Sequence, residues 1–281
     1  MDSYLTFHHK TSLFNLEMKK KLFYSIGKIK TSKKINCLTK NYFKFVFQNF
    51  WIYTPTCYYL IMFYLYKDLQ SYLGLKCEKN FIVAIDKILF GEKIYDFMVL
   101  IQHPMLDLFS ALCYLAHFCL PIIFSAYLIF YKRENNNFLK FFLSFGLVSF
   151  SGVIIQYLIP TPPPWMFNKS TSPEANFVRV DKLIDINLFK NLYSNSPLKC
   201  GACPSLHAAW PTVILFTRPW INVHFCCFHV ASIAFAAIYS GHHYVIDVLF
   251  GFFLAWFFTK ISNRIIERNF SDKNYIHTET V

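Results

Sequence analysis

The chain has 281 residues, of which 55% are hydrophobic, 20% are aromatic and only 16% are charged. Soluble domains carry about 25% charged residues, and 33 Phe and 18 Tyr cannot be buried in a globule of this size without large exposed apolar patches. The composition therefore excludes ordinary soluble, disordered and small disulfide-stabilised proteins and favours an integral membrane protein.

The N-terminal segment, residues 1–44, is strongly basic. Its ten lysines against Asp2 and Glu17 supply +8 of the formal net charge of +12. A basic run before an apolar stretch is typical of a cytosolic flank that contacts anionic lipid, and a solvated tail without a specific ligand is an equally good interpretation. Nucleic-acid binding is disfavoured because no recognition motif follows the basic run. We expect no cleavable signal peptide, because the apolar stretch begins too late.

Six apolar stretches predict membrane helices. The first three contain no Asp, Glu, Lys or Arg and are close to the ~20 residues that a span needs, whereas the last three are shorter or begin with polar residues, as helices packed inside protein do. Residues 81–89 have the amphipathic pattern of a helix at the membrane interface. The sequence thus predicts an all-α polytopic membrane protein, with six transmembrane helices in a bundle plus this interfacial helix. The expected spans are 45–66, 108–131, 141–159, 205–217, 222–240 and 243–259.

Basic residues predict the orientation of these spans. The segments on the side of the termini contain 18 Lys and Arg, against 10 on the opposite side, which places both termini in the cytosol. The chain then divides into a basic cytosolic segment (1–44), a membrane domain (45–260) with a lumenal loop (160–204), and a cytosolic tail (261–281).

Three motifs fall at the predicted lumenal face: Pro-Thr-Pro-Pro-Pro-Trp at 160–165, Cys-Pro-Ser-Leu-His at 203–207 and Ser-Gly-His-His-Tyr-Val-Ile-Asp at 240–247. His243 and Asp247 are four residues apart, so a helix would place them on one face. The carboxylate can then accept a hydrogen from one imidazole nitrogen and leave the other free as a nucleophile or base.

A second histidine complements this pair. His207 comes from another predicted span at the same depth and can protonate a departing oxygen while the first histidine attacks phosphorus. Ser205 and the backbone N–H groups at the start of that span suit phosphate oxygens. A single membrane histidine is more often structural, but an intramembrane Asp costs about 3 kcal/mol unless it is paired or functional, which favours a catalytic role for His207, His243 and Asp247.

These residues resemble those of the type 2 phosphatidic acid phosphatase superfamily, which carries a Pro-Ser-x-His motif and a later His-x3-Asp motif. The similarity is closest to the fungal-type inositol phosphorylceramide synthase catalytic subunit. It covers roughly residues 100–260 and rests on four ordered segments: Pro163-Pro164-Trp165, Arg179-Val180-Asp181-Lys182, the Gly-Ala-x-Pro-Ser-Leu-His run at 201–207, and the His-His-Tyr-x-x-Asp run at 242–247.

The resemblance implies a transferase that moves phosphoinositol from phosphatidylinositol to ceramide and releases diacylglycerol. It assigns His243 as the nucleophile, Asp247 as the residue that orients it, and His207 as the acid for the leaving group. It implies no cofactor and no metal, lipid substrates, and a Golgi or endoplasmic reticulum membrane with the active site lumenal. It leaves an accessory subunit open. The alternatives are a lipid phosphate phosphatase that uses water, a transferase with another head group, and a non-catalytic membrane protein of the same fold.

The chain lacks a basic residue that the wider superfamily has near its catalytic histidines. The superfamily has an arginine six residues before the second catalytic histidine, where this chain has Ala237. Arg179, Lys182 and Lys199 are candidates to bind the phosphate in its place, with solvated loop charges as the plain alternative. Cys200 and Cys203 are compatible with either a disulfide or free thiols, and Asn168 begins a glycosylation sequon.

Overall fold

The computed structural model divides into two units, Met1–Phe50 and Trp51–Val281, and the account below concerns the second. The basic segment, the Asn168 sequon, Lys199 and the end of the C-terminal tail lie outside the residues that the structure describes. These described residues are 47, 49–78, 81–91, 93–132, 135–167, 177–196, 200–218 and 221–270.

Helices make up this part of the chain, and no strand occurs among the described residues apart from one isolated bridge between Thr161 and Gly201. The prediction of an all-α fold is confirmed. The helices are α3 (Phe50–Tyr64), α4 (Tyr66–Tyr72), α5 (Phe81–Phe90), α6 (Lys93–Leu100), α7 (Pro104–Ala126), α8 (Asn135–Leu158), α9 (Val178–Ile184), α10 (Leu188–Asn195), α11 (Leu206–Thr217), α12 (Val223–Tyr239) and α13 (Val245–Phe270).

Side-chain caps explain where several of these helices begin. The imidazole of His103 accepts a hydrogen bond from the Met105 N–H at the start of α7, next to a proline in the first turn. Asn222 caps α12 in the same way through its side-chain oxygen, and Ser205 caps α11. These caps satisfy N–H groups that the first turn of a helix leaves without a partner.

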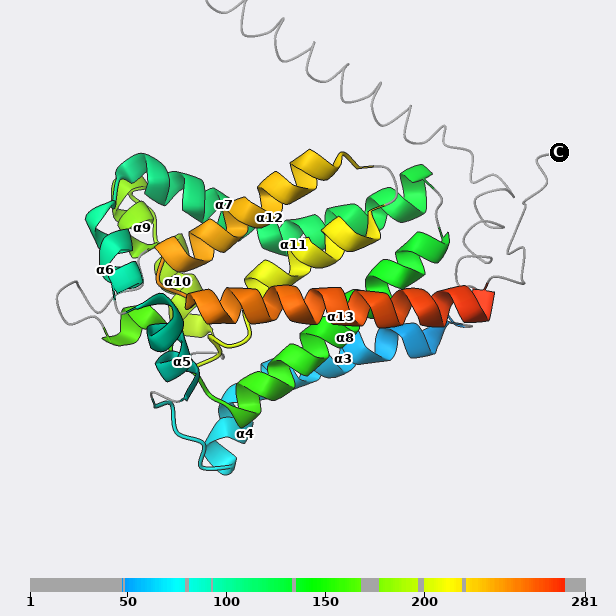
Figure 1. Cartoon of the computed structure of the whole chain (residues 1–281), viewed down its shortest axis with the longest axis horizontal. Coiled ribbons are helices and arrows are strands. Elements are labelled where there is room, and N and C mark those ends of the chain that lie inside the picture. The colour runs from blue at the N-terminus through cyan, green and yellow to red at the C-terminus, as the bar shows by residue number, and fades with distance from the viewer. Residues whose placement is uncertain are drawn as a thin grey trace, which may run out of the picture. The chain divides into compact units, whose positions relative to one another are not determined.

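The long helices form a bundle, and the short helices α5, α6, α9 and α10 gather at one end of it (Figure 1). α11 packs between α13, α12, α8 and α7. Small or β-branched residues allow this close packing, because Ala208, Ala237 and Val248 form one buried cluster from three helices. The N-termini of α7, α11 and α13 all lie at the end that carries the short helices (Figure 1).

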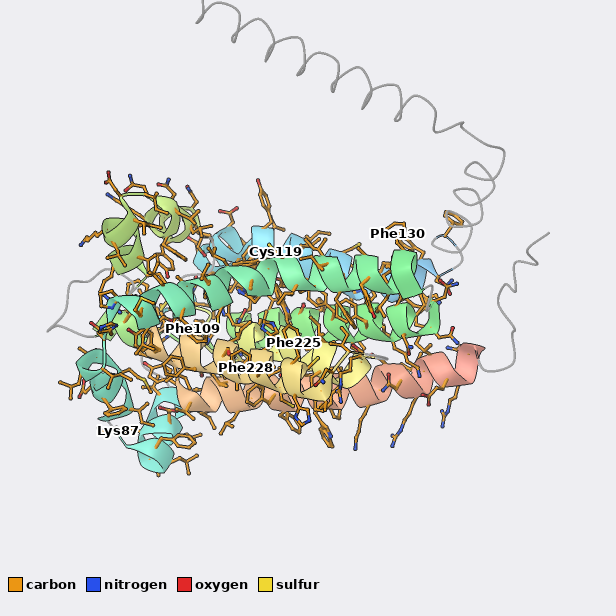
Figure 2. The ribbon with its side chains drawn as sticks, turned by 90° about the horizontal axis from the view of Figure 1, so that it is seen from above. Lys87, Phe109, Cys119, Phe130, Phe225 and Phe228 are labelled. Carbon is orange, nitrogen blue, oxygen red and sulfur yellow. A yellow bond between two sulfur atoms is a disulfide. The ribbon has the colours of Figure 1, made fainter. Side chains whose placement is uncertain are left out.

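Three helical segments in the described part of the chain are long and apolar enough to cross a bilayer: Pro104–Phe130, Asn135–Leu158 and Val245–Asn269. α11 and α12 are shorter apolar helices. Figure 2 shows the labelled side chains of Phe109 and Cys119 on α7, of Phe130 in the π-helical segment Tyr127–Lys132 that follows it, and of Phe225 and Phe228 on α12. All five are exposed in the absence of lipid, which supports a bilayer as their solvent.

Two local features differ from the sequence-based boundaries. α13 continues to Phe270, ten residues past the expected end of the membrane domain, because Ile266 is buried in the bundle although charged residues surround it in sequence. The loop 160–204 contains α9 and α10, which pack on the first turns of α7 through Ala111, Phe177 and Phe189.

The interfacial helix predicted at 81–89 forms as α5. Its apolar residues Phe81, Ile88 and Leu89 are exposed, as expected for a face that contacts a bilayer. Asp86, which interrupts the apolar pattern, is instead buried against the bundle.

A disulfide joins Cys77, in the segment after α4, to Cys200, just before α11. The Cys200–Cys203 pairing that the sequence left open therefore does not form, and Cys203 is a free, buried thiol. The partner of Cys200 lies 123 residues away in sequence, so the local Cys-x-x-C spacing did not indicate it.

Candidate active site

The two histidine motifs meet at the end of the bundle that carries the short helices. His207 lies in the first turn of α11, and His243 lies two residues before α13. Their rings are joined by a 2.8 Å contact between His207 Nδ1 and His243 Nε2. His243 is buried, so the imidazole pair is largely shielded from bulk solvent.

The backbones that carry these histidines touch directly. The Ser205 N–H, at the cap of α11, donates to the carbonyl of Asp247 in the first turn of α13 at 3.0 Å. One turn further along α13, a Cβ atom on Gly251 would lie only 2.3 Å from the Ser205 carbonyl oxygen. A glycine at this position therefore allows the two helices to approach closely enough for the imidazoles to meet.

His243 is oriented mainly by a backbone carbonyl. Its Nδ1 lies 2.6 Å from the Ala202 carbonyl oxygen, whereas the nearest Asp247 carboxylate oxygen is 3.8 Å away. That carboxylate oxygen accepts a hydrogen bond from the Tyr244 N–H at 2.8 Å and caps α13. The expected span 243–259 would place His243 inside the helix. Because α13 begins after His243, the Asp247 carboxylate lies near the ring but is not its direct hydrogen-bond acceptor.

This arrangement assigns the hydrogens of the imidazole pair. A carbonyl oxygen only accepts, so His243 Nδ1 must carry the hydrogen that it shares with Ala202. The neutral ring then presents a lone pair on Nε2, and His207 Nδ1 donates its hydrogen to it. His243 thus offers a nucleophilic nitrogen, and His207 holds a proton next to it.

A cavity of about 530 Å³ opens onto the pair. Apolar and aromatic side chains supply most of its wall, including Tyr59, Phe63, Phe118, Trp165, Leu206 and Trp210. The Tyr114 ring stacks on His207 with ring centroids 4.7 Å apart, and His117 meets His207 edge-on at 4.3 Å. Neither Tyr114 nor His117 is marked by a motif in the sequence, because no local pattern connects α7 to α11.

The other predicted site residues occupy different positions. The Ser205 hydroxyl accepts from the Ala208 N–H at 3.3 Å and is fully buried in this cap. Arg179 donates to both carboxylate oxygens of Asp107, at 2.6 and 3.1 Å, and the Tyr239 hydroxyl donates to the same carboxylate at 2.8 Å. Arg179 and the exposed Lys182 on α9 are not part of the cavity wall.

Lys190, on α10, is the only lysine or arginine in the described wall of the cavity. Its backbone N–H is held by Asp181, whose carboxylate also accepts from the Phe189 N–H and so fixes the start of α10. The sequence analysis did not single out Lys190, which carries no motif of its own. It lies eight residues beyond the conspicuous Arg-x-Asp-Lys segment at 179–182.

Two more buried groups surround the Asp247 turn. Burial raises the pKa of the Cys203 thiol and the Asp247 charge raises it further, so the thiol stays protonated. Asp86 of α5 reaches the start of α13 and accepts a hydrogen bond from the Ile246 N–H at 2.8 Å. Within the described segments, no cluster of three or more His, Cys, Asp or Glu side chains could hold a metal ion.

We expect Asp86→Ala to destabilise the protein by about 1–2 kcal/mol, as the loss of a helix cap does. Asp86→Asn keeps an acceptor oxygen and should cost less than half as much. Thermal unfolding in detergent micelles measures both variants, and equal losses for the two would contradict the capping role.

Comparison with known proteins agrees with this geometry. A family model described as the PAP2 superfamily matches residues 80–261, well over half of the chain. The chain belongs to the PAP2 superfamily. The match contains both histidine motifs and the helices between them, and the family resemblance expected from those motifs is confirmed.

The sequence of the chain is similar to those of three named relatives. The chain is 33% identical to a phosphoinositol dihydroceramide synthase of Bacteroides thetaiotaomicron, over 60% of this chain and 61% of the relative. It is 27% and 28% identical to the inositol phosphorylceramide synthase catalytic subunits of Schizosaccharomyces pombe and Saccharomyces cerevisiae, over 61% and 62% of this chain. The match spans only 44% and 46% of those two proteins. No solved structure matches the chain.

Proposed function

We propose that the protein is a sphingolipid-synthesising phosphotransferase that moves phosphoinositol from phosphatidylinositol to ceramide. The observation that carries the proposal is the 2.8 Å contact between His207 Nδ1 and His243 Nε2 at the base of an apolar cavity. The names of the relatives support the choice of inositol phospholipid and ceramide as substrates.

In the first half-reaction, the Nε2 lone pair of His243 attacks the phosphorus of phosphatidylinositol. A P–N bond forms, and the P–O bond to the glycerol oxygen breaks. His207 acts here as an imidazolium with a hydrogen on each ring nitrogen; it gives one proton to that oxygen and becomes a neutral imidazole, so diacylglycerol leaves as a neutral alcohol. The Ala202 carbonyl, which accepts from Nδ1, and the nearby Asp247 carboxylate stabilise the positive charge that develops on the His243 ring.

In the second half-reaction, the primary hydroxyl of ceramide attacks the same phosphorus. His207, now a neutral imidazole, accepts the hydroxyl hydrogen and returns to the imidazolium, and the P–N bond breaks to restore neutral His243. The phosphodiester keeps one negative charge throughout, and Lys190 in the cavity wall is placed to attract it. The lipid-like wall suits the acyl chains of both substrates and excludes water, which would otherwise compete as acceptor.

The proposal includes six transmembrane helices: α3, α7, α8, α11, α12 and α13. α11 has 12 residues and rises only about 18 Å, so it would lie inside the bundle, where nearly all of its residues are buried. With the termini cytosolic, the histidine pair faces the lumen of the Golgi or endoplasmic reticulum. The Cys77–Cys200 disulfide near the site supports that side, because disulfides persist in oxidising compartments.

The deciding experiment supplies microsomes that contain the protein with head-group-labelled phosphatidylinositol and fluorescent ceramide. We expect a charged sphingolipid that carries both the head-group label and the fluorescent ceramide, together with free diacylglycerol. Release of labelled inositol phosphate without a sphingolipid product would instead indicate a lipid phosphate phosphatase. Failure to consume either lipid would contradict the proposal and favour a transferase with another head group or a non-catalytic protein of the same fold.

A further inference from the structure

His242 is next to His243 in sequence, but its ring packs against different aromatic side chains. Phe177 and Tyr193 stack on it, each with ring centroids 5.2 Å from the imidazole. The side chain is 9% exposed, and it belongs to the wall of the same cavity that His207 and His243 line. The proposed phosphotransfer steps do not use it.

The hydrogen bonds of His242 determine what its second nitrogen can do. Nδ1 lies 2.6 Å from the Ser240 hydroxyl oxygen, and that hydroxyl donates to the Ala237 carbonyl at 3.3 Å. Nδ1 must therefore carry the hydrogen and donate it to Ser240. Burial, assisted by the nearby His243, lowers the pKa of His242 to about 3, so the ring is neutral and Nε2 holds a lone pair.

This lone pair has no hydrogen-bond partner among the described residues. The same is true of the buried Tyr193 hydroxyl and of the buried Gln156 side-chain oxygen, and both of these residues line the cavity. A buried acceptor without a donor is costly. The His242 lone pair and the Gln156 oxygen need a hydroxyl or N–H donor, and a phosphate oxygen, which has no hydrogen at neutral pH, cannot supply one. The Tyr193 hydroxyl can both donate and accept.

We propose that His242 Nε2 and the Tyr193 hydroxyl bind hydroxyl groups of the polyol head group of the donor lipid. The inference rests on the proposed function and extends it to the recognition of the head group. Diacylglycerol leaves and ceramide enters during one cycle, whereas the head group stays on the phosphorus through both half-reactions. A hydroxyl of the head group can therefore stay bonded to the His242 lone pair through both half-reactions. Head groups without hydroxyl donors, such as phosphocholine, would leave that lone pair without a partner.

The test measures kcat and KM for each lipid with the other saturating, in the full-length protein. His242→Phe keeps an aromatic ring for stacking but removes both nitrogens, and Tyr193→Phe removes one hydroxyl. We expect KM for phosphatidylinositol to rise about tenfold in His242→Phe and about threefold in Tyr193→Phe, with KM for ceramide unchanged. His242→Gln, which can place an acceptor oxygen near the Nε2 position, should stay within about threefold of the wild type.

A second substrate separates binding from structural damage. A phosphatidylinositol analogue with ring hydroxyls replaced by hydrogen should bind the wild type about tenfold more weakly, and should lose little more in His242→Phe. An unchanged KM for phosphatidylinositol in both phenylalanine variants, or a rise confined to ceramide, would overturn the inference while the transferase proposal stands. Absence of transfer by the wild type would overturn the proposed function, and this inference with it.

Discussion

Replacing His243 with alanine should reduce phosphoinositol transfer by at least about 10³-fold, because it removes the proposed nucleophile. His207 should not substitute for it, since its Nδ1 hydrogen points at the position that His243 Nε2 occupies. The proposed mechanism predicts a labelled covalent adduct of the wild type with head-group-labelled phosphatidylinositol, and the variant should lose it. Both losses are measured in microsomes that contain equal amounts of protein.

His224→Ala is the matched control, since His224 is exposed on α12 and lies outside the cavity wall. It should keep wild-type activity. His242→Ala should fall between the two, because it impairs substrate binding and leaves the nucleophile in place. Retained transfer in His243→Ala would show that the nucleophile is assigned wrongly, and a larger loss in His242→Ala would show that the wrong member of the adjacent pair was chosen.

Replacing Gly251 with alanine should reduce activity by at least about 100-fold, although Gly251 does not line the cavity. The added methyl group would lie 2.3 Å from the Ser205 carbonyl oxygen, so α13 or the start of α11 must move. Backbone atoms cannot rotate away as a side chain can, and a shift of about 1 Å between catalytic groups costs roughly 10²-fold. We also expect a loss of about 1–3 kcal/mol in stability, measured by thermal unfolding.

Gly152→Ala provides the comparison. A methyl group there would meet Leu206 Cδ2 at 2.6 Å, which is the flexible end of a side chain and can turn aside. Its activity should stay within about fivefold of the wild type. If the two variants lose activity equally, general overpacking rather than the Ser205–Gly251 contact limits the site.

The helices could be predicted from local sequence. Each expected span forms a helix, because helix formation in an apolar segment depends on residues that are neighbours along the chain. The predicted span ends at the first charged residues, but the helix itself continues to Phe270. Ile266 extends the buried face beyond those residues, and only packing against the bundle shows this.

The roles of the charged residues could not be predicted from local sequence, because they depend on contacts between distant parts of the chain. Arg179 was a reasonable phosphate ligand by residue type, but its partner Asp107 lies 72 residues away in sequence. Asp86 looked like a break in an amphipathic helix, whereas it caps a helix that begins 159 residues later. In both cases the apolar surroundings favour pairing of the charge, and the identity of the partner follows from the fold.

The sequence by itself determined that the chain is helical and apolar enough for a membrane. It also determined that His207, His243 and Asp247 belong to one family pattern, because composition and spacing are properties of the chain alone. The tertiary structure decided which atoms meet. Ala202, 41 residues before His243, accepts the Nδ1 hydrogen and leaves Nε2 facing His207. Hydrogen bonds are directional over about 3 Å, so the chemistry of an imidazole depends on neighbours that only the packing of α11 against α13 brings within reach.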